Sequence, residues 1–472
     1  MDAVSIPNLE SIARCLTTFA DGTTANLVKG PDPRFGMQAP LNKSQTLTTP
    51  GGLSRTTTME RTANLSDPAN LLSLNSQTTT VAINERPYTR AYDTASHTFT
   101  DTTPAGRQRV TTIDAKGRAI QSAVAGTFPV QVAYDERGRL ASLTQDDRTY
   151  ALTYDSQGNL STLTNPLVHG VRLTYDATGR MTRQILPDGR QIRYGYDSNG
   201  NMTSLTPPGR PPHVFTYTTA DQTEEYQPPL LTGSGNTRYN YDTDKKIVHI
   251  TYPDGQSIGF GYDAAGRLSS QTTPTGVTNY VYDATTGKLN HLTAADGGKL
   301  DVTYDGSLLT RVTSSGTVAG DVGFSYNNDF RLSSLTLNGS DPVTFAYDAD
   351  NFLTQAGALV LTRGVQDGLV IGTALGIVTD ALSYNGFREL LSYTAQINAA
   401  SVFSTQFTRD KLGHITRKIE TLGGRPRTYD YSYDLAGRLI QVRQDGTVSA
   451  SYTYDSNGNR LTASGVSRAV LR

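Results

Sequence analysis

The sequence predicts an all-β protein, an array of antiparallel β-hairpin repeats of about 21 residues that forms a curved, spiralling sheet. Three observations lead to this prediction. A short Tyr-Asp motif recurs at nearly constant spacing, and the residues before each copy alternate as they do in a β-strand. Each copy also carries the Asp and Gly of a tight turn. Together these features place one hairpin in each repeat.

The motif has the form Tyr-Asp-x-x-Gly-(Arg or Asn)-(Leu or Met). From Tyr134 the steps between copies are 20, 21, 21 and 21 residues, a regularity that composition alone does not produce. The clear copies, ending once in Arg, give the expected structural repeat residues Tyr134, Asp135, Gly138, Tyr154, Asp155, Gly158, Tyr175, Asp176, Gly179, Tyr196, Asp197, Gly200, Tyr262, Asp263, Gly266, Tyr433, Asp434, Gly437, Tyr454, Asp455 and Gly458. Looser copies begin at Ile113, Tyr217, Tyr241, Tyr282, Tyr304, Tyr326, Tyr347, Tyr384 and Arg409.

The local chemistry of each repeat is that of two strands and two turns. The segment Gln191 to Tyr196 alternates between side chains for one face and side chains for the other. In the motif turn the Asp carboxylate accepts hydrogen bonds from backbone N–H groups, and Gly takes the positive φ that leads into the next strand. The opposite turn is marked in several repeats by Asp-Gly, as at Asp188-Gly189, Asp254-Gly255 and Asp445-Gly446.

From about Ile113 to Leu461 the motif copies strongly resemble those of the RHS/YD-repeat family. Similar repeats occur in bacterial polymorphic toxins, in the cocoon-forming components of insecticidal toxin complexes and in teneurins, where the sheet spirals into a hollow shell. The Thr-rich alternation from Gln45 to Thr112 looks like the upstream part of such proteins, although it lacks regular Tyr-Asp pairs. We therefore expect degenerate N-terminal β repeats over residues 1–112 and a YD-repeat β-shell over 113–472, with insertions near 217–241 and 347–384.

Simple geometry agrees with a hollow β-shell or part of one. About sixteen hairpins supply about 32 strands, which at roughly 4.8 Å per strand make a sheet about 150 Å wide. Curled evenly into one turn, this sheet has a diameter of about 50 Å, whereas one layer of side chains fills only about 5 Å. A two-layer sandwich with a dry core is disfavoured, since apolar residues make up only 36% of the chain.

Composition excludes several function classes. A formal net charge of −1 gives no attraction to nucleic acid or to an anionic membrane. The single cysteine, Cys15, allows no internal disulfide and no thiolate zinc site. The most apolar stretch, Gly368 to Thr379, is too short for a transmembrane segment, which needs about 20 residues. The first residues carry Asp2 and Glu10 and do not form a Sec signal peptide.

No pattern in the sequence predicts a catalytic, cofactor or metal site, so we expect no enzyme and no cofactor. Gly255 to Gly259 matches a nucleophile elbow, but it lies inside an expected strand instead of a strand-to-helix turn. The stretches 197–201 and 455–459 imitate the start of a calcium loop, yet their Gly is fourth and not sixth. The six histidines, His97, His169, His213, His249, His291 and His414, show no ligand spacing.

The sequence thus favours a non-catalytic structural shell segment. The resemblance implies that the intact protein is secreted or lies at the cell surface and encloses a C-terminal toxin domain. The Asp-Pro-x-Gly-Leu type motif of toxin relatives is absent before Arg472, so we expect a segment without that core or toxin. The alternative is a cell-surface adhesion or carbohydrate-binding module that contacts glycans. Exposed sheet edges further predict self-association or fraying over 451–472.

Overall fold

The computed structural model describes residues 14–229 and 235–465 of the 472-residue chain. It contains 41 strands in one antiparallel sheet and, within the described ranges, no helix. The predicted all-β array of antiparallel hairpins in a curved sheet is therefore confirmed. None of these residues forms a helix long and apolar enough to cross a bilayer. The chain divides into two compact units, each made of two separate stretches of sequence.

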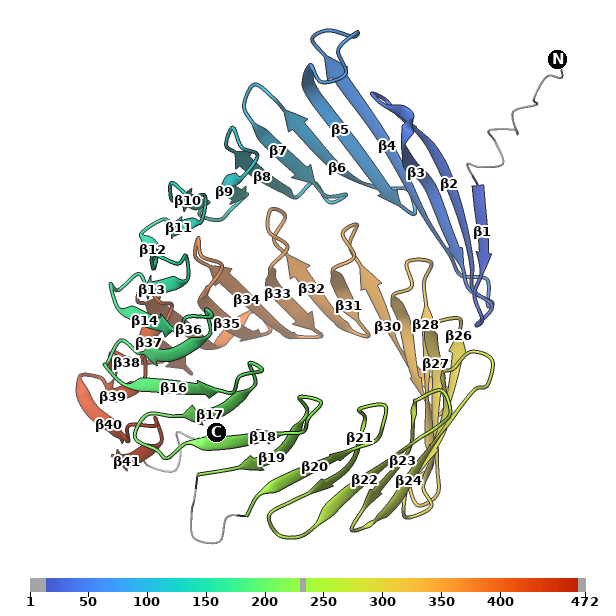
Figure 1. The fold of residues 1–472 in the computed structure, drawn as a ribbon. Coiled ribbons are helices and arrows are strands. Elements are labelled where there is room, and N and C mark those ends of the chain that lie inside the picture. The colour runs from blue at the N-terminus through green and yellow to red at the C-terminus, as the bar shows by residue number, and fades with distance from the viewer. Residues whose placement is uncertain (1–13, 230–234, 466–472) are drawn as a thin grey trace, which may run out of the picture. The chain divides into compact units, whose positions relative to one another are not determined.

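Unit 1 comprises the residues up to Pro129 together with Tyr280–Thr379. Its strands form two runs, β1–β9, blue to teal in Figure 1, and β25–β33, yellow to orange. These strands are β1 (Arg14–Thr18), β2 (Thr24–Asp32), β3 (Gly36–Thr48), β4 (Ser54–Leu65), β5 (Leu74–Ile83), β6 (Arg86–Asp93), β7 (Thr98–Thr102), β8 (Gln108–Ile113), β9 (Ala119–Val124), β25 (Leu289–Thr293), β26 (Lys299–Asp305), β27 (Leu308–Ser315), β28 (Gly320–Tyr326), β29 (Leu332–Leu337), β30 (Ser340–Tyr347), β31 (Leu353–Ala356), β32 (Leu359–Arg363) and β33 (Val370–Leu375).

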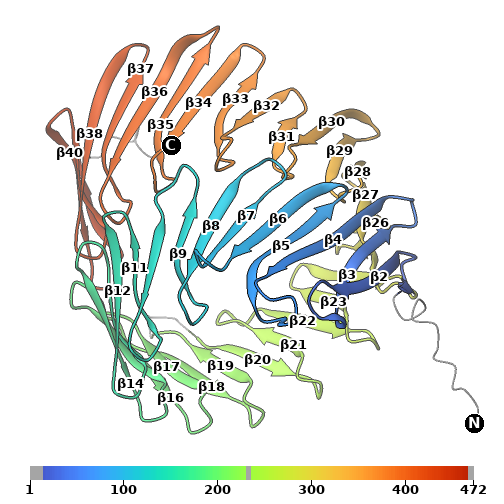
Figure 2. The same ribbon diagram turned by 90° about the horizontal axis from the view of Figure 1, so that it is seen from above.

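Unit 2 comprises Val130–Asn279 together with the residues from Asp380 onward. Its strands again form two runs, teal to yellow-green and orange to red in Figure 2. They are β10 (Val130–Tyr134), β11 (Leu140–Gln145), β12 (Arg148–Tyr154), β13 (Leu160–Thr164), β14 (Gly170–Tyr175), β15 (Met181–Ile185), β16 (Gln191–Tyr196), β17 (Met202–Thr206), β18 (His213–Tyr217), β19 (Thr223–Gln227), β20 (Thr237–Tyr241), β21 (Ile247–Thr251), β22 (Ser257–Tyr262), β23 (Leu268–Thr273), β35 (Leu390–Ile397), β36 (Ala400–Arg409), β37 (Ile415–Leu422), β38 (Arg425–Tyr433), β39 (Leu439–Gln444), β40 (Thr447–Tyr454) and β41 (Arg460–Ser464). Two strands, β24 (Gly276–Tyr282) and β34 (Val378–Tyr384), contribute residues to both units.

A β-bulge recurs at the tyrosine of the motif. In the β10–β11 pair, Ala133 faces Ser142 but Tyr134 faces Leu140, so one residue of β11 has no partner. The same register shift occurs at Tyr154, Tyr175, Tyr196, Tyr217, Tyr241, Tyr262, Tyr304, Tyr326, Tyr347, Tyr433 and Tyr454. A bulge bends a strand and increases its twist. The bulges at the motif tyrosines all lie at the same end of their hairpins, which we call the motif end, and they therefore curve the sheet within each unit.

The two faces of the sheet carry different side chains. In β16, Ile192, Tyr194 and Tyr196 point to one face, and Tyr194 lies opposite Leu205 of the next strand. We call this the tyrosine face. Arg193 points to the other face and lies opposite Thr206. This second face, on which Thr, Ser, Arg and Gly dominate in β13–β17, is called the polar face.

The sheet is a single layer without a conventional core. Among the described residues only Ala25 and Ala450 are buried apolar residues, at 8% and 7% exposure, and no large side chain is fully buried. The accessible surface is 28002 Å². A compact monomer of the same mass exposes about 17,000 Å². Water therefore reaches side chains on both faces, as the low apolar content had indicated.

The two breaks in the repeat period differ in structure. Near 217–241, β19 ends at Gln227 and β20 begins at Thr237, and part of the connection, 230–234, lies outside the described residues. Near 347–384 the chain forms the further hairpin β32–β33 between β31 and β34. This stretch therefore continues the array by one further short hairpin, whereas the sequence had suggested one longer hairpin. The domain boundary at residue 112 stays a prediction.

The positive φ of the motif glycine gives a test of the turn. Gly179 has φ 82°, and a Cβ atom added there would have no neighbour closer than 3.6 Å, so replacement by Ala introduces backbone strain without a clash. We expect Gly179→Ala to cost about 1–2 kcal/mol, measured as lost hydrogen-exchange protection of the β14–β15 amides. Gly170→Ala is the matched control, because its φ is not positive and its nearest neighbour is also 3.6 Å away. Equal protection in both variants contradicts the assignment.

Candidate functional site: the motif turns and the seams between runs of strands

The Asp and Gly of the motif close the turn. The Asp135 N–H donates to the Arg139 carbonyl at 2.8 Å, and the Gly138 N–H donates to the Asp135 carbonyl at 2.9 Å. Gly138 has φ 82°, a conformation that glycine adopts at no steric cost. The same positive φ is found at Gly158, Gly179, Gly200, Gly266, Gly437 and Gly458. The structure therefore places all seven glycines of the clear copies at the same point of the turn.

The Asp side chain holds the residue that follows the glycine. Asp135 Oδ1 accepts the Arg139 backbone N–H at 2.8 Å, and Oδ2 accepts Arg139 Nε at 2.8 Å. The Arg139 backbone hydrogen bond is the main cause that lowers the pKa of Asp135. The same two bonds join Asp176 to Arg180, Asp263 to Arg267 and Asp434 to Arg438, and Asn takes the place of Arg beside Asp155, Asp197 and Asp455. The carboxylate thus fixes the backbone and one side chain together.

In many copies of the motif the tyrosine hydroxyl links its hairpin to the one before it. Tyr154 Oη donates at 2.8 Å to the carbonyl of Leu140, the residue that ends the preceding motif copy. The same bond joins Tyr196 to Met181, Tyr217 to Met202, Tyr262 to Ile247, Tyr347 to Leu332, Tyr433 to Ile415 and Tyr454 to Leu439. At Tyr175, burial raises the pKa of the hydroxyl. A hydroxyl in this position donates a hydrogen bond to a backbone carbonyl near the bulge.

The basic residue of the motif packs on the next tyrosine. The Arg139 guanidinium lies 4.1 Å from the centre of the Tyr154 ring. Arg180 and Arg438 lie 4.9 and 4.8 Å from the Tyr196 and Tyr454 rings. Cation–π contacts at partly exposed sites contribute about 0.5–1 kcal/mol each. The Arg-to-tyrosine contact between successive copies was not apparent from the sequence, although the period of the two residues was.

Two positions keep the geometry with different residues. At the β32–β33 turn Arg363 stands where the motif has Tyr, and its Nε donates to the Leu353 carbonyl at 2.9 Å. In the copy that begins at Arg409, His414 stands where the motif has Arg. Its Nδ1 lies 2.9 Å from Asp410 Oδ2, and its ring stacks on Tyr433 at 4.8 Å. Sequence reasoning missed Arg363. The pair Gly368-Leu369, at the end of its turn, was the available signal.

A second set of contacts joins the two runs of strands inside unit 1. The Arg107 guanidinium binds Asp348 at 2.8 Å and also contacts Asp350, both in the motif turn after Tyr347. Asp350 further accepts from Thr103 Oγ1 at 2.7 Å and from the Ala105 N–H at 2.9 Å. The Arg107 and Asp350 side chains are only 11% and 4% exposed. This cluster is the most buried group of charges among these contacts.

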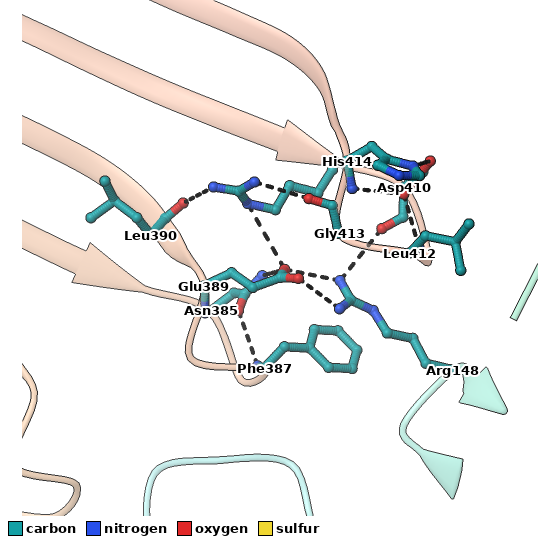
Figure 3. A network of polar contacts seen from close by, with 10 residues as sticks. Arg148, Asn385, Phe387, Glu389, Leu390, Asp410, Leu412, Gly413 and His414 are labelled. Carbon is teal, nitrogen blue, oxygen red and sulfur yellow. Dashed lines mark hydrogen bonds and ion pairs between the residues drawn. The ribbon is translucent and has the colours of Figure 1, made fainter. Parts of the chain in front are cut away.

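The same arrangement joins the two runs of unit 2 (Figure 3). Arg148 binds both carboxylate oxygens of Glu389, at 2.7 and 2.9 Å, and lies 3.5 Å from the centre of the Phe387 ring. Asn385 donates to Glu389 at 2.9 Å, and Arg148 also reaches the Asp410 carbonyl at 3.4 Å. The hydrogen bond from Arg148 is the main cause that lowers the pKa of Glu389. We call these turn-to-turn contacts the seams.

In both units the seams join turns that are separated by the same number of strands. In each, a return turn, the turn opposite to the motif end, meets a motif turn 23 strands later in the chain. The β7–β8 turn meets the β30–β31 turn through Arg107, and the β11–β12 turn meets the β34–β35 turn through Arg148. At the ends of the runs, Lys288 of the β24–β25 turn binds Asp21 at 2.7 Å, and Arg210 of the β17–β18 turn binds Asp455 at 2.5 Å. No local pattern could have predicted these partners.

The other candidate motifs occupy ordinary places in the sheet. Ser257 begins β22 after the turn of Gly255, so Gly255 to Gly259 does not form a strand-to-helix elbow. Asp197 and Asp455 receive hydrogen bonds from their own turns. Cys15 is an exposed free thiol in β1. In the described part of the chain, no group of three or more His, Cys, Asp or Glu residues is placed to hold a metal ion.

Comparisons with known proteins agree with this geometry. The family model described as Teneurin YD-shell matches residues 3–470. Human teneurin-4 is 23% identical over 248 residues, covering 50% of this chain and 9% of teneurin-4. Mouse teneurin-3 is 25% identical over 349 residues, covering 70% of this chain and 12% of teneurin-3. The chain therefore spans about a tenth of the length of the teneurins that it matches.

Solved structures show the same fold. A crystal structure of TcdB2-TccC3-TEV superposes on 96% of this chain and 28% of its own chain, with a TM-score of 0.59 and 14% identity. TcdB2-TccC3 without its hypervariable C-terminal region superposes on 95% of this chain and 30% of its own, with a TM-score of 0.50 and 12% identity. At these identities the likeness concerns the fold.

The link between hairpins can be tested by removing one hydroxyl. Tyr196→Phe deletes the hydrogen bond to Met181 and keeps the ring beside Arg180. We expect a loss of about 0.5–1.5 kcal/mol, measured by hydrogen exchange of the β15–β16 amides. Tyr239→Phe is the control, since the Tyr239 hydroxyl makes no hydrogen bond to any residue that the structure describes. A larger loss in the control than in Tyr196→Phe rules the link out.

The seam of unit 2 predicts a dependence on pH. The folded state lowers the pKa of Glu389 below its ordinary 4.5. The stabilisation is therefore complete above about pH 4.5 and disappears as the pH falls through the lower, folded pKa. We expect Arg148→Met to remove about 2 kcal/mol at pH 7 and to abolish this acid-dependent part, measured as protection of the 385–389 amides.

The matched control for the seam is Arg172→Met, because Arg172 lies in a strand of the same unit and has no carboxylate partner among the residues that the structure describes. This variant keeps the protection of the 385–389 amides at pH 7 and its loss on acidification. If Arg148→Met and the unchanged protein lose protection over the same acid range, the pair with Glu389 is not the source of the effect.

Proposed function

Because the chain belongs to the teneurin YD-shell family, we propose that it is a wall-forming segment of a shell that encloses a C-terminal effector domain in the intact protein. The family membership also confirms the resemblance to YD-repeat proteins that the motif copies had indicated. A structural role follows from the family and the fold. Enclosure of an effector is the proposal.

The single-layer construction is the observation that carries this proposal. A sheet with no buried large side chain in its described part gains little from packing against itself. Its stability comes from hydrogen bonds between strands, from the tyrosine and arginine links, and from the seams. Such a wall stands without filling the space beside it, which is what an enclosing structure requires.

The structural neighbours support enclosure by their composition. One TcdB2-TccC3 crystal structure was solved without a hypervariable C-terminal region. A protein with a hypervariable C-terminal region fits a container that carries different effectors. For this chain we propose the same division of labour, with no catalytic residue in the shell. We also place the intact protein outside the cytoplasm, as a secreted or cell-surface protein.

Adhesion through glycans, the alternative expected from the sequence, stays a prediction. So does self-association through sheet edges. The last described strand, β41, pairs with β40 and is exposed throughout, and residues 466–472 of the segment expected to fray lie outside the described residues.

Enclosure predicts protection of a segment joined to the C-terminal side. An unstructured, protease-sensitive peptide attached after Arg472 is expected to be cut at least about tenfold more slowly than the same peptide attached before Met1, because only the first enters the enclosed space. The measurement is the rate of cleavage under conditions in which the shell itself remains intact.

Small-angle scattering of the same samples checks that the wall has formed. A solid globule of this length has a radius of gyration of about 23 Å, and the proposed shell exceeds that value. Equal cleavage of the two peptides, with the larger radius observed, removes the enclosure proposal and leaves the wall-forming role in place.

A further inference from the structure

Two neighbouring hairpins of unit 2, β35–β36 and β37–β38, protrude at their return turns. Strands β36, β37 and β38 contain 10, 8 and 9 residues, whereas β13–β18 contain five or six each. The β39–β40 turn ends beside Thr428, because the Asp445 N–H donates to the Thr428 carbonyl at 2.8 Å. The β37–β38 hairpin continues past that turn. Residues 397–402 and 422–427, which we call the two tips, are exposed throughout.

The two tips combine aliphatic side chains with positive charge. Leu422 is 66% exposed, and Ile397 and Val402 are 42% and 37% exposed. Leu422 lies opposite Arg425, and Arg427 follows two residues later on the same strand, so these three side chains project from one face of the sheet. The two tips contain no Asp and no Glu. Apolar and cationic groups therefore lie together at this end of the hairpins.

Within the described ranges, neither arginine of the tips has a carboxylate partner. Glu420 lies opposite Arg427, but its carboxylate binds Lys418 at 2.6 Å. The carboxylate of Asp445, in the next return turn, accepts a backbone N–H at 2.8 Å. Neither Arg425 nor Arg427 makes a hydrogen bond to any residue that the structure describes. Their positive charge is available to a partner from outside the chain.

The return turns of the first runs differ in this respect, because they hold the seams. There, Arg107 and Arg148 bind motif turns of another run of strands. At the tips, the Gly423 N–H donates to the Val402 carbonyl at 3.2 Å, a bond that joins two adjacent strands. Among the described residues the tips bind no turn of another run. The exposed side chains of the tips are therefore not explained by the construction of the wall.

We propose that the two tips dock onto the surface of a lipid bilayer that contains anionic phospholipids. The aliphatic side chains enter the boundary between headgroups and acyl chains, and the guanidinium groups of Arg425 and Arg427 bind lipid phosphates. The net charge of the whole chain, −1, gives no general attraction to such a surface. The attraction comes from the charge concentrated at the tips, since it acts only within about 10 Å. This inference does not depend on the enclosed effector.

An acidic peptide fits the tips less well than a bilayer. A peptide binds a sheet by adding a strand at an edge, or it fills a groove. β36, β37 and β38 are each paired on both sides, and the part of β38 that extends past β39 includes Pro426, which has no N–H to donate. The ends of tight hairpins are convex and offer no groove. A fluid bilayer can close around convex tips.

The test measures binding of the full chain to vesicles of phosphatidylcholine with about one quarter phosphatidylglycerol. We expect binding that weakens as salt is added. Arg425→Gln/Arg427→Gln is expected to bind at least about tenfold more weakly, because both charges near the anionic surface are lost. The matched control, Arg172→Gln/Arg193→Gln, removes two exposed arginines from strands of the same unit and is expected to stay within about twofold of the unchanged protein.

A second measurement reports insertion of a side chain instead of charge. The chain contains no tryptophan, so Leu422→Trp places a single indole at a tip. We expect its fluorescence to shift to shorter wavelength when the vesicles are added, because indole prefers the membrane interface. Leu337→Trp is the matched control. Leu337 is 57% exposed and precedes the turn Asn338-Gly339, whose positive φ values resemble those of Gly423-Gly424, but Asp341 follows it where the tip has arginines. We expect no shift in this control.

Both tryptophan variants alter exposed turns, where substitutions change stability little. The proposal is overturned if the full chain does not bind the anionic vesicles, or if the two double arginine variants lose affinity equally. It is also overturned if the fluorescence of Leu422→Trp stays unchanged on vesicles that bind the protein, or if Leu337→Trp shifts as much.

Discussion

The structure depends on the contact between one hairpin and the next at the motif end. A sheet whose two faces both contact water has little buried apolar surface to stabilise it. The links between successive motif turns therefore contribute a larger share of its stability. The tyrosine hydroxyl satisfies the carbonyl that ends the preceding motif, and the basic residue of that motif covers the tyrosine ring. Each link is worth only about 1 kcal/mol, but it recurs along the array. In repeat proteins, stability is largely the sum of such neighbour terms.

The seams add a second direction of support. The motif links connect hairpins that are neighbours in sequence, whereas Arg107 and Arg148 each connect turns that lie 241 residues apart in sequence. Partly buried ion pairs with several hydrogen bonds are specific in geometry, since removing one partner leaves the other charge unpaired. The motif turn therefore serves twice. Its backbone hydrogen bonds close a hairpin, as between Asn351 and Asp348, and its side chains, such as Asp350 and Glu389, receive an arginine from another run of strands.

Much of the fold could be predicted from the sequence because the repeat is local. The alternation before Tyr196 predicts a strand, and Asp197 with Gly200 predicts the turn, since each signal lies within a few residues. Where the chemistry is kept by a different residue, the prediction fails. Arg363 donates to a carbonyl as a tyrosine would, but it does not match the motif. The seams could not be predicted from the sequence for another reason. The partner of Arg148 depends on the path of the whole sheet and not on the residues near Arg148 in the sequence.

The offset of 23 strands limits how such an array can change during evolution. A duplicated hairpin inserted between β18 and β24 would move every later motif turn by two strands, so that Arg107 and Arg148 would face the wrong turns. Duplication of a hairpin therefore keeps the pairs made by Arg107 and Arg148 only if the new hairpin lies outside the strands that separate each arginine from its partner turn. Extra residues inside a return turn, as between Gln227 and Thr237, leave the strand count unchanged. Longer loops are therefore compatible with the seams in places where an additional hairpin is not.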